Sequence, residues 1–166
     1  RPQGMPAGRF IPAGRYRFNS QAVSYDSSNA QKVSFNGAWR FGDFYNGARK
    51  GFTATSRLRV NEKLAATLSI TRDMIELPGG TSFDTNLSSL RVDASFSTRM
   101  FLNAFLQYNS VTRQFASNIR YDFIHHPLSD VFIVYNDSRF IDISQPTAAQ
   151  VPNRALVLKV THLLSF

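Results

Sequence analysis

The amino-acid sequence predicts an all-β protein of about nine antiparallel strands, and three observations lead to that fold class. Apolar and polar residues alternate over one segment after another, which is the period of a β-strand. The 166 residues include fifteen Phe and six Tyr, and aromatic residues favour strands. Clusters of Gly, Pro, Asn, Asp and Ser separate the alternating segments at hairpin spacing.

The expected strands cover residues 14–25, 32–41, 51–60, 64–74, 90–97, 100–109, 114–123, 131–135 and 155–166. The first of them alternates only weakly. In residues 32–41, every second residue from Val33 to Phe41 is apolar or Gly, and the residues between them are mostly polar. The next two segments follow the same pattern with one exception each on the apolar face, Ser56 and Arg72.

The second half of the chain alternates more cleanly. Residues 90–97, 100–109 and 114–123 each set a mainly apolar face against another face, which is mostly polar apart from residues such as Phe101 and Phe105. Residues 131–135, "VFIVY", are apolar on both faces, which is typical of a short buried strand. The last segment, "ALVLKVTHLLSF", alternates again and ends on Phe166.

The residue types on the polar face distinguish a soluble sandwich from a membrane protein. In a sandwich this face meets water and is rich in Lys, Glu and Thr, whereas here it holds Arg, Asp, Asn, Gln, Ser, Thr, Ala and Gly. We therefore predict an antiparallel transmembrane β-barrel, with the apolar face toward lipid and the polar face toward a lumen. A soluble β-protein with an aromatic core and a soluble calycin-like binding barrel are the alternatives.

The connections predict an orientation, because such barrels have short periplasmic turns and longer extracellular loops. With Phe166 at the periplasmic edge, "DSRFIDISQPTAAQVPN", "ELPGGTSFDTN" and "GDFYNGARK" become extracellular loops. Aromatic residues are then expected at the two membrane interfaces. They are Trp39, Phe41, Tyr108 and Phe115 on the outer side and Phe96, Tyr121 and Phe123 on the periplasmic side.

An odd number of strands predicts an incomplete barrel. Bacterial barrels have an even strand count with both ends in the periplasm, and nine strands leave the first end outside. The absence of a signal peptide and of an initial Met agrees with this interpretation. We therefore expect residues 1–13 to be an extracellular loop or linker, and residues 14–166 to be the C-terminal strands of a larger barrel.

Charge and composition exclude several function classes. The net charge of +8 comes from basic residues scattered singly through the strands, so no nucleic-acid partner is expected. The chain has no cysteine and hence no disulfide or thiolate metal site. No apolar run approaches the ~20 residues of a membrane-spanning helix.

No convergent set of catalytic groups is predicted, so we expect a protein that is not an enzyme. His125 and His126 are adjacent in a turn and make a poor metal site, because neighbouring residues of an extended chain point apart. Asp73, Asp93 and Asp122 are candidates for a carboxylate site, but salt bridges in a lumen are the simpler interpretation. No catalytic residue, metal ion or cofactor is expected.

Nine charged residues are predicted to face the lumen. They are Arg40, Arg57, Arg59, Asp73, Arg91, Asp93, Arg120, Asp122 and Lys159. Basic residues outnumber acidic ones in this set, which would favour anions in an open lumen. Two functions remain open: a conduit across the outer membrane, or a structural anchor with a closed or plugged lumen that displays a surface domain or partner complex.

Several stretches of the sequence resemble a known protein family. The stretches "IPAGRYRF", "GDFYNGARKGF", "NIRYDFIHHPLSDVFIVYND" and "RALVLKVTHLLSF" are similar to the C-terminal barrel of a family of large bacterial proteins. In those proteins a domain resembling a carbohydrate-binding module precedes a barrel of unknown function. The resemblance extends from about Phe10 to Phe166 and implies a location in the outer membrane of a Gram-negative bacterium. It does not carry a glycan-binding or hydrolytic role to these residues, because that role rests on the N-terminal domain.

The closing strand also resembles the insertion signal of outer-membrane barrels. Lys159, Leu164 and Phe166 match its polar, hydrophobic and terminal aromatic positions, while Thr161 stands where Gly is preferred. The resemblance implies the barrel-assembly machinery as a partner during insertion. Outer-membrane lipid, lipopolysaccharide and other outer-membrane or periplasmic subunits are the further expected partners.

Overall fold

The computed structural model describes residues 15, 18–45, 47–77, 81–141 and 153–163. They form nine strands: β1 (Ser20–Asp26), β2 (Val33–Phe44), β3 (Gly47–Asn61), β4 (Leu64–Leu77), β5 (Thr81–Ser97), β6 (Met100–Asn109), β7 (Gln114–His126), β8 (Ser129–Phe140) and β9 (Asn153–Val160). The prediction of an all-β, antiparallel chain of about nine strands is confirmed.

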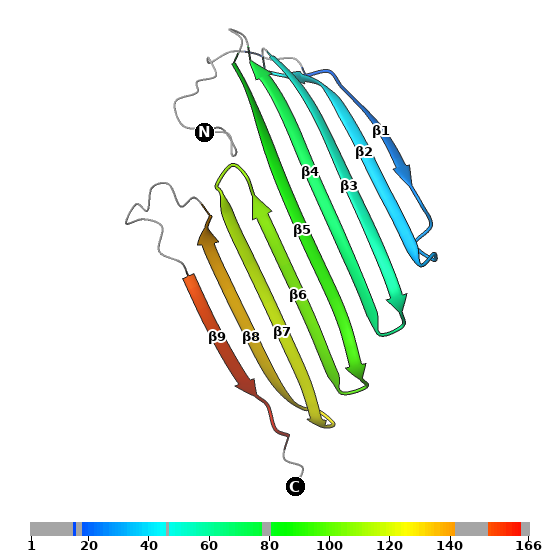
Figure 1. The fold of residues 1–166 in the computed structure, drawn as a ribbon, viewed down its shortest axis with the longest axis vertical. Helices are drawn as coiled ribbons and strands as arrows, with labels where there is room; N and C mark the ends of the chain where they lie inside the picture. The colour runs from blue at the N-terminus through cyan, green and yellow to red at the C-terminus, as the bar shows by residue number, and fades with distance from the viewer. Residues whose placement is uncertain (1–14, 16–17, 46, 78–80, 142–152, 164–166) are drawn as a thin grey trace.

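The nine strands make one antiparallel sheet in which each strand pairs with the next along the chain (Figure 1). β1 and β9 are its two edges, and the sheet is open. The closed barrel predicted from the sequence is thus not formed by the described strands alone. Within the described residues, no helix has the length and hydropathy to cross a membrane.

Several strands are longer than predicted, and two expected loops are largely strand. β2 ends and β3 begins within the "GDFYNGARK" stretch. β4 continues to Leu77, and β5 begins at Thr81. The physical reason lies on the apolar face, where polar residues such as Arg72 and Asp84 replace apolar ones toward these ends. The strands remain paired there, but the alternation that marked them in the sequence is lost.

The strands at the two ends of the chain also differ from the prediction. β1 begins at Ser20 instead of residue 14, and β8 extends over Ser129–Phe140 instead of 131–135. β9 ends at Val160, so His162 lies beyond it. Leu164, Phe166 and the predicted linker 1–13 lie outside the described residues.

Three of the connections at the end of the sheet where β3, β5, β7 and β9 finish share one construction. The β3–β4, β5–β6 and β7–β8 hairpins each have a register shift just before a two-residue turn. The opposite end of the sheet carries the β2–β3, β4–β5, β6–β7 and β8–β9 connections. We refer to these as the lower and upper ends of the sheet, as drawn in Figure 1.

Pairing gives the sheet two chemically distinct faces, because directly opposed residues project to the same side. One row of directly opposed residues crosses eight strands through Phe35, Ser56, Leu68, Leu90, Leu106, Ser117, Asp137 and Arg154. The face that contains this row is the apolar face. The other is the polar face, and its equivalent row contains Ser34, Arg57, Thr67, Arg91, Phe105, Asn118, Asn136 and Ala155.

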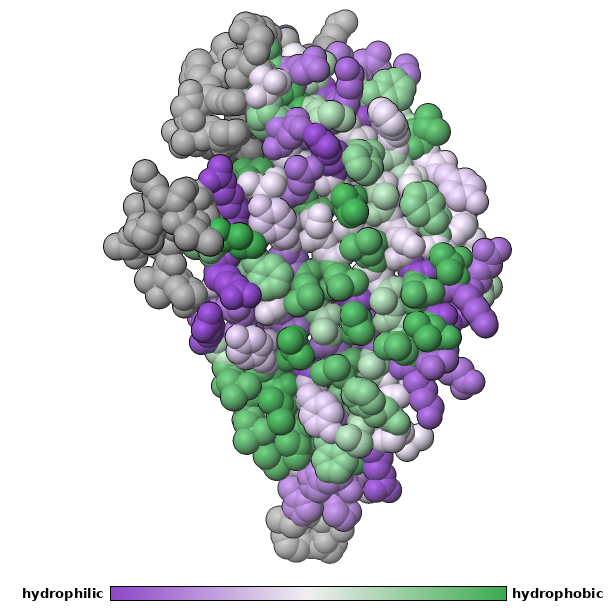
Figure 2. All heavy atoms as spheres, viewed as in Figure 1, coloured by the Kyte–Doolittle hydropathy of each residue, from purple (hydrophilic) through white to green (hydrophobic). Residues whose placement is uncertain are grey.

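The sheet is a single layer with almost no core. Of the described hydrophobic side chains, only Ile75 and Phe83 are buried, while Val23 and Leu156 are 67% and 71% exposed. Figure 2 shows hydrophobic side chains spread over the middle of the visible face and down to β9, with hydrophilic ones around them. The apolar face is therefore not covered by any other described part of the chain.

Candidate functional site: the polar face

The register places all nine charged residues that were predicted to line a lumen on the polar face. Arg40 comes from β2, Arg57 and Arg59 from β3, Asp73 from β4, Arg91 and Asp93 from β5, Arg120 and Asp122 from β7, and Lys159 from β9. They lie on the same face of the sheet, so their side chains share one surface.

Four of these basic residues follow a line across the sheet, one on each of β3, β5, β7 and β9. We call Arg57, Arg91, Arg120 and Lys159 the basic stripe. Arg57 and Arg91 lie in one row of directly opposed residues, since both pair with Thr67 of β4. The two arginines are thus two strands apart at the same level.

The other half of the stripe moves toward the lower end of the sheet. The row of Arg57 and Arg91 continues to Asn118 on β7 and Ala155 on β9. Arg120 lies two residues from Asn118, and Lys159 four residues from Ala155, both on the lower side. The stripe therefore slants across the strands.

Aromatic rings support two members of the stripe. The Arg91 guanidinium lies 5.4 Å from the ring centroid of Phe105, and that of Arg120 lies 4.6 Å from the centroid of Phe132. These cation–π contacts hold the guanidinium groups close to the sheet. Lys159 pairs with Phe132 from the other side.

The charges of the stripe are only partly neutralised. Arg120 lies 3.5 Å from the Asp122 carboxylate. Within the described part of the chain, Arg57, Arg91 and Lys159 have no acidic partner. Arg120 and Lys159 border a shallow hollow of about 300 Å³, which Phe132, Val134 and Val157 also line. An anion over this part of the sheet would meet unneutralised positive charge.

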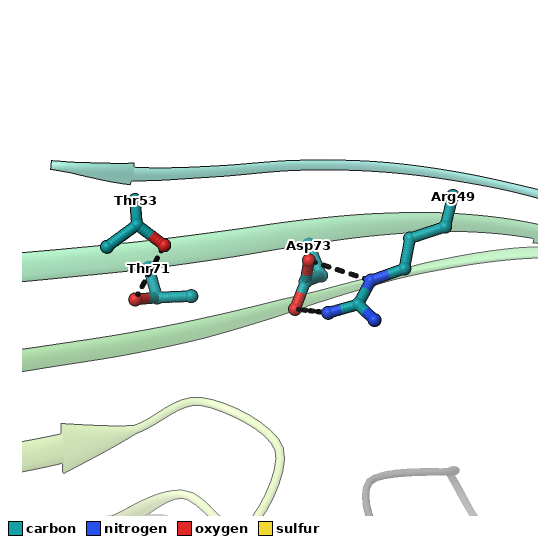
Figure 3. A network of polar contacts seen from close by, with 4 residues as sticks. All are labelled: Arg49, Thr53, Thr71 and Asp73. Carbon is teal, nitrogen blue, oxygen red and sulfur yellow. Dashed lines mark hydrogen bonds and ion pairs between the residues drawn. The ribbon is translucent and has the colours of Figure 1, made fainter. Parts of the chain in front are cut away.

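Asp73 belongs to a separate contact near the upper end (Figure 3). Arg49 donates from Nε to Oδ1 at 3.0 Å and from Nη2 to Oδ2 at 2.8 Å, a bidentate ion pair. Gly51, which pairs with Asp73, leaves the space that the carboxylate fills, since a Cβ there would contact Asp73 Oδ1. Arg49 was missed because it fell in an expected loop.

The three aspartates do not form a carboxylate site. Asp73 is bound by Arg49, Asp93 accepts a hydrogen bond from Asn103 Nδ2 at 2.8 Å, and Asp122 contacts Arg120. No three His, Cys, Asp or Glu side chains of the described residues are placed to bind a metal ion. Asp73 and Asp93 thus have partners on a neighbouring strand, and Asp122 has a partner on its own strand.

The three histidines lie together at the lower end of the sheet. Ring centroids of His125 and His126 are 5.2 Å apart, and the ring of His162 lies parallel to that of His125 at 5.7 Å. The sequence suggested that His125 and His126 point apart, and it gave no reason to add His162. His162 reaches the other two rings because the segment after β9 lies alongside the β7–β8 hairpin, where Thr161 and Asp130 exchange backbone hydrogen bonds.

The apolar face changes to charged residues at its upper margin. Arg72 Nη2 lies 2.6 Å from Asp84 Oδ2. Further along the margin, Asp137 lies between Arg139 and Arg154, at 3.5 Å and 3.4 Å. Sequence reasoning missed these pairs, because Asp84 and Asp137 fell in expected loops.

Six of the seven aromatic residues predicted at interfaces project from the apolar face, and the seventh, Phe96, lies in the register shift between Ser95 and Ser97. Trp39, Phe41, Tyr108 and Phe115 lie toward the upper end of β2, β6 and β7, and Phe96, Tyr121 and Phe123 toward the lower end of β5 and β7. They thus form two groups, one toward each end of the sheet.

Comparison with known proteins identifies no relative: no family model, curated protein or solved structure matches this chain.

Proposed function

We propose that the sheet is part of the wall of an outer-membrane β-barrel whose polar face lines a conduit that favours anions. The observation that carries the proposal is a band of apolar side chains that crosses the apolar face of this single-layer sheet at a slant to the strands. We call it the apolar band. An exposed apolar face of this extent is rare in soluble monomers. In a bilayer, lipid would cover it and the paired strands would satisfy their backbone groups.

The band slants relative to the strands as it does in a tilted barrel wall. On β2 it extends from Val33 to Phe41, and Asp43 is the first charged residue above it. On β8 the corresponding charged residue is Asp137, which lies in the row of Phe35. The upper margin therefore drops by eight residues along β2 over the six strand steps from β2 to β8.

This drop corresponds to a definite strand tilt. Eight residues at about 3.3 Å span about 26 Å, and six strand spacings of about 4.8 Å span about 29 Å. The strands would then lie about 40° from the normal of the band, within the roughly 35–45° of transmembrane barrels. The band itself would be about 20 Å tall along that normal, not far below the ~25 Å of such barrels.

Closure of the barrel requires strands beyond the nine described. β1 and β9 run in the same direction, since they are separated by an even number of antiparallel steps. An odd number of additional strands would allow both edges to pair antiparallel and give an even count. The proposed family resemblance, outer-membrane location and assembly partners are consistent with this arrangement and stay predictions.

The basic stripe supports the preference for anions. It slants in the same direction as the apolar band on the opposite face, but it drops by only four residues from β3 to β9, whereas the margin of the band drops by eight residues over the same number of strand steps. Lys159 would therefore lie closer to the upper margin of the band than Arg57. Rings of like charge set ion selectivity in pores. Arg57, Arg91 and Lys159 contribute charge that no described acid neutralises.

Reversal potentials of the full-length protein in planar bilayers test the conduit. In a KCl gradient we expect a preference for chloride that falls clearly in the variant Arg57→Gln/Arg91→Gln. The matched control is Lys63→Gln/Arg99→Gln, which removes the same charge from two turns at the lower end and should keep most of the preference.

The structural anchor is the second candidate, and the internal contacts of the polar face favour it. Cross-strand bonds such as Thr55–Ser69 and Asn118–Asn136 occupy polar groups that a solute would otherwise meet. Silence of the full-length protein at all voltages, together with normal membrane insertion, would reject the conduit in favour of the anchor. A protein that is soluble without detergent would reject both.

A further inference from the structure

Three charged residues form a compact cluster at the upper margin of the apolar face. Asp137 and Arg139 come from β8, and Arg154 comes from β9 directly opposite Asp137. Asp137 is only 5% exposed, whereas the side chains of Arg139 and Arg154 are 50% and 57% exposed. A buried carboxylate therefore holds two accessible guanidinium groups side by side.

The geometry leaves these guanidinium groups able to bind a second anion. Arg139 approaches Asp137 Oδ2 through Nε at 3.5 Å, and Arg154 approaches Oδ1 through Nε at 3.4 Å. A guanidinium has five N–H donors, so most donors of each arginine remain. One carboxylate also leaves one positive charge of the pair unbalanced. At the Arg72–Asp84 contact, by comparison, one acid balances one base.

The surroundings of the cluster identify the kind of anion. The Arg139 guanidinium lies 5.3 Å from the ring centroid of Phe115. On the next row below Asp137 and Arg154, Tyr135 pairs with Leu156. The basic groups thus stand immediately above an aromatic and aliphatic surface. A ligand that fits both parts has a phosphate next to hydrocarbon chains, which is the chemistry of a lipid headgroup.

We propose that Arg139 and Arg154 bind the phosphate of an outer-leaflet lipid such as lipid A, and that Phe115 and Leu156 contact its acyl chains. Asp137 is a positioning residue that keeps the two guanidinium groups together. This inference rests on the proposed membrane location, because only there does the margin of the apolar band meet headgroups. Charge-assisted bonds from two arginines to one phosphate give both affinity and orientation.

Binding of a fluorescent diphosphoryl lipid A by the full-length protein in neutral detergent tests the site. We expect Arg139→Gln/Arg154→Gln to weaken binding roughly tenfold or more. The control Lys63→Gln/Arg99→Gln loses the same charge at the other end of the sheet and should bind as the unchanged protein does. Equal affinity of the Arg139/Arg154 variant and the control would overturn the proposal.

A third variant and a competition experiment distinguish lipid binding from a folding defect and from a free-phosphate site. Removal of both arginines leaves Asp137 buried without a partner, so the triple variant Asp137→Asn/Arg139→Gln/Arg154→Gln keeps the test available if the double variant does not fold. If inorganic phosphate displaced lipid A at the same concentration as the lipid, the site would be one for free phosphate. That result would overturn the proposal that the ligand is a lipid.

Insertion of the unchanged protein into phosphatidylcholine vesicles tests the membrane location separately, because those vesicles contain no lipid A. A protein that inserts there but does not bind lipid A would overturn this site and leave the proposed function standing. A protein that does not insert there would contradict both the proposed function and this site.

Discussion

Gly51 shows how a single backbone position shapes the polar face. It pairs with Asp73, and the carboxylate lies over it to meet both donating nitrogens of Arg49. An added Cβ would take the place of Asp73 Oδ1. The residue type at position 51 and the ion pair are thus coupled.

A double-mutant cycle measures this coupling. At a compatible position, Gly→Ala stabilises by about 0.4–1 kcal/mol through the unfolded chain. We expect Gly51→Ala instead to lower the free energy of unfolding by up to about 1 kcal/mol, because it displaces a half-exposed ion pair. In an Asp73→Ala background the same change should stabilise. Urea unfolding in detergent micelles gives the four values, and an equal effect of Gly51→Ala in both backgrounds would contradict the coupling.

At the scale of the element, neighbouring residues of one strand are expected to differ in what they tolerate. On β6, Ala104 is midway between Met100 and Tyr108 on the apolar face, while Asn103 projects from the polar face. Arginine near the middle of a bilayer costs about 2–4 kcal/mol on the lipid side.

Ala104→Arg should therefore lose roughly that free energy of unfolding from lipid vesicles. Asn103→Arg is the matched control, with the same new charge one residue away, and should lose little because its guanidinium can replace the amide donor to Asp93. Equilibrium unfolding with guanidinium chloride compares the two variants. Similar losses in both would mean that the apolar face does not meet lipid.

The sequence was sufficient to assign residues to the two faces of the strands, but it did not predict where the strands end. A period of two depends only on the strand itself, so residues such as Arg91 and Asp93 could be assigned to the polar face directly. The ends depend on the partner strand as well. Asp84 remains in β5 because β4 pairs with it through Met74, although the local pattern there resembles a loop.

The contacts of the candidate sites were also beyond the sequence, for a related reason. Arg49 meets Asp73 across a strand pair, and Arg154 meets Asp137 across a connection of twelve residues between β8 and β9. Such pairs follow from the register, and register is set by turns and by shifts such as the one at Ile124 and His126. Alternation alone does not contain that information.

At the scale of the whole molecule, the slant of the band links the register of β2 to β8 to the proposed orientation in the membrane. Each strand pair moves the apolar margin by little more than one residue, which no single hairpin reveals. Added over the sheet, these small shifts mean that one row of opposed residues begins at Phe35, within the band. The same row ends at Asp137 and Arg154, on the charged margin of the band.

This accumulated slant predicts a measurable angle. In oriented phosphatidylcholine bilayers, polarised infrared spectra of the amide I band should give a mean strand tilt of about 40° from the membrane normal, the value that the drop of the margin implies. A barrel with untilted strands would place Phe35 and Asp137 at the same depth, which would put a charge at the level of a deeply immersed aromatic ring. A measured tilt below roughly 20° would therefore contradict the membrane orientation, because the apolar band would no longer match the bilayer across the sheet.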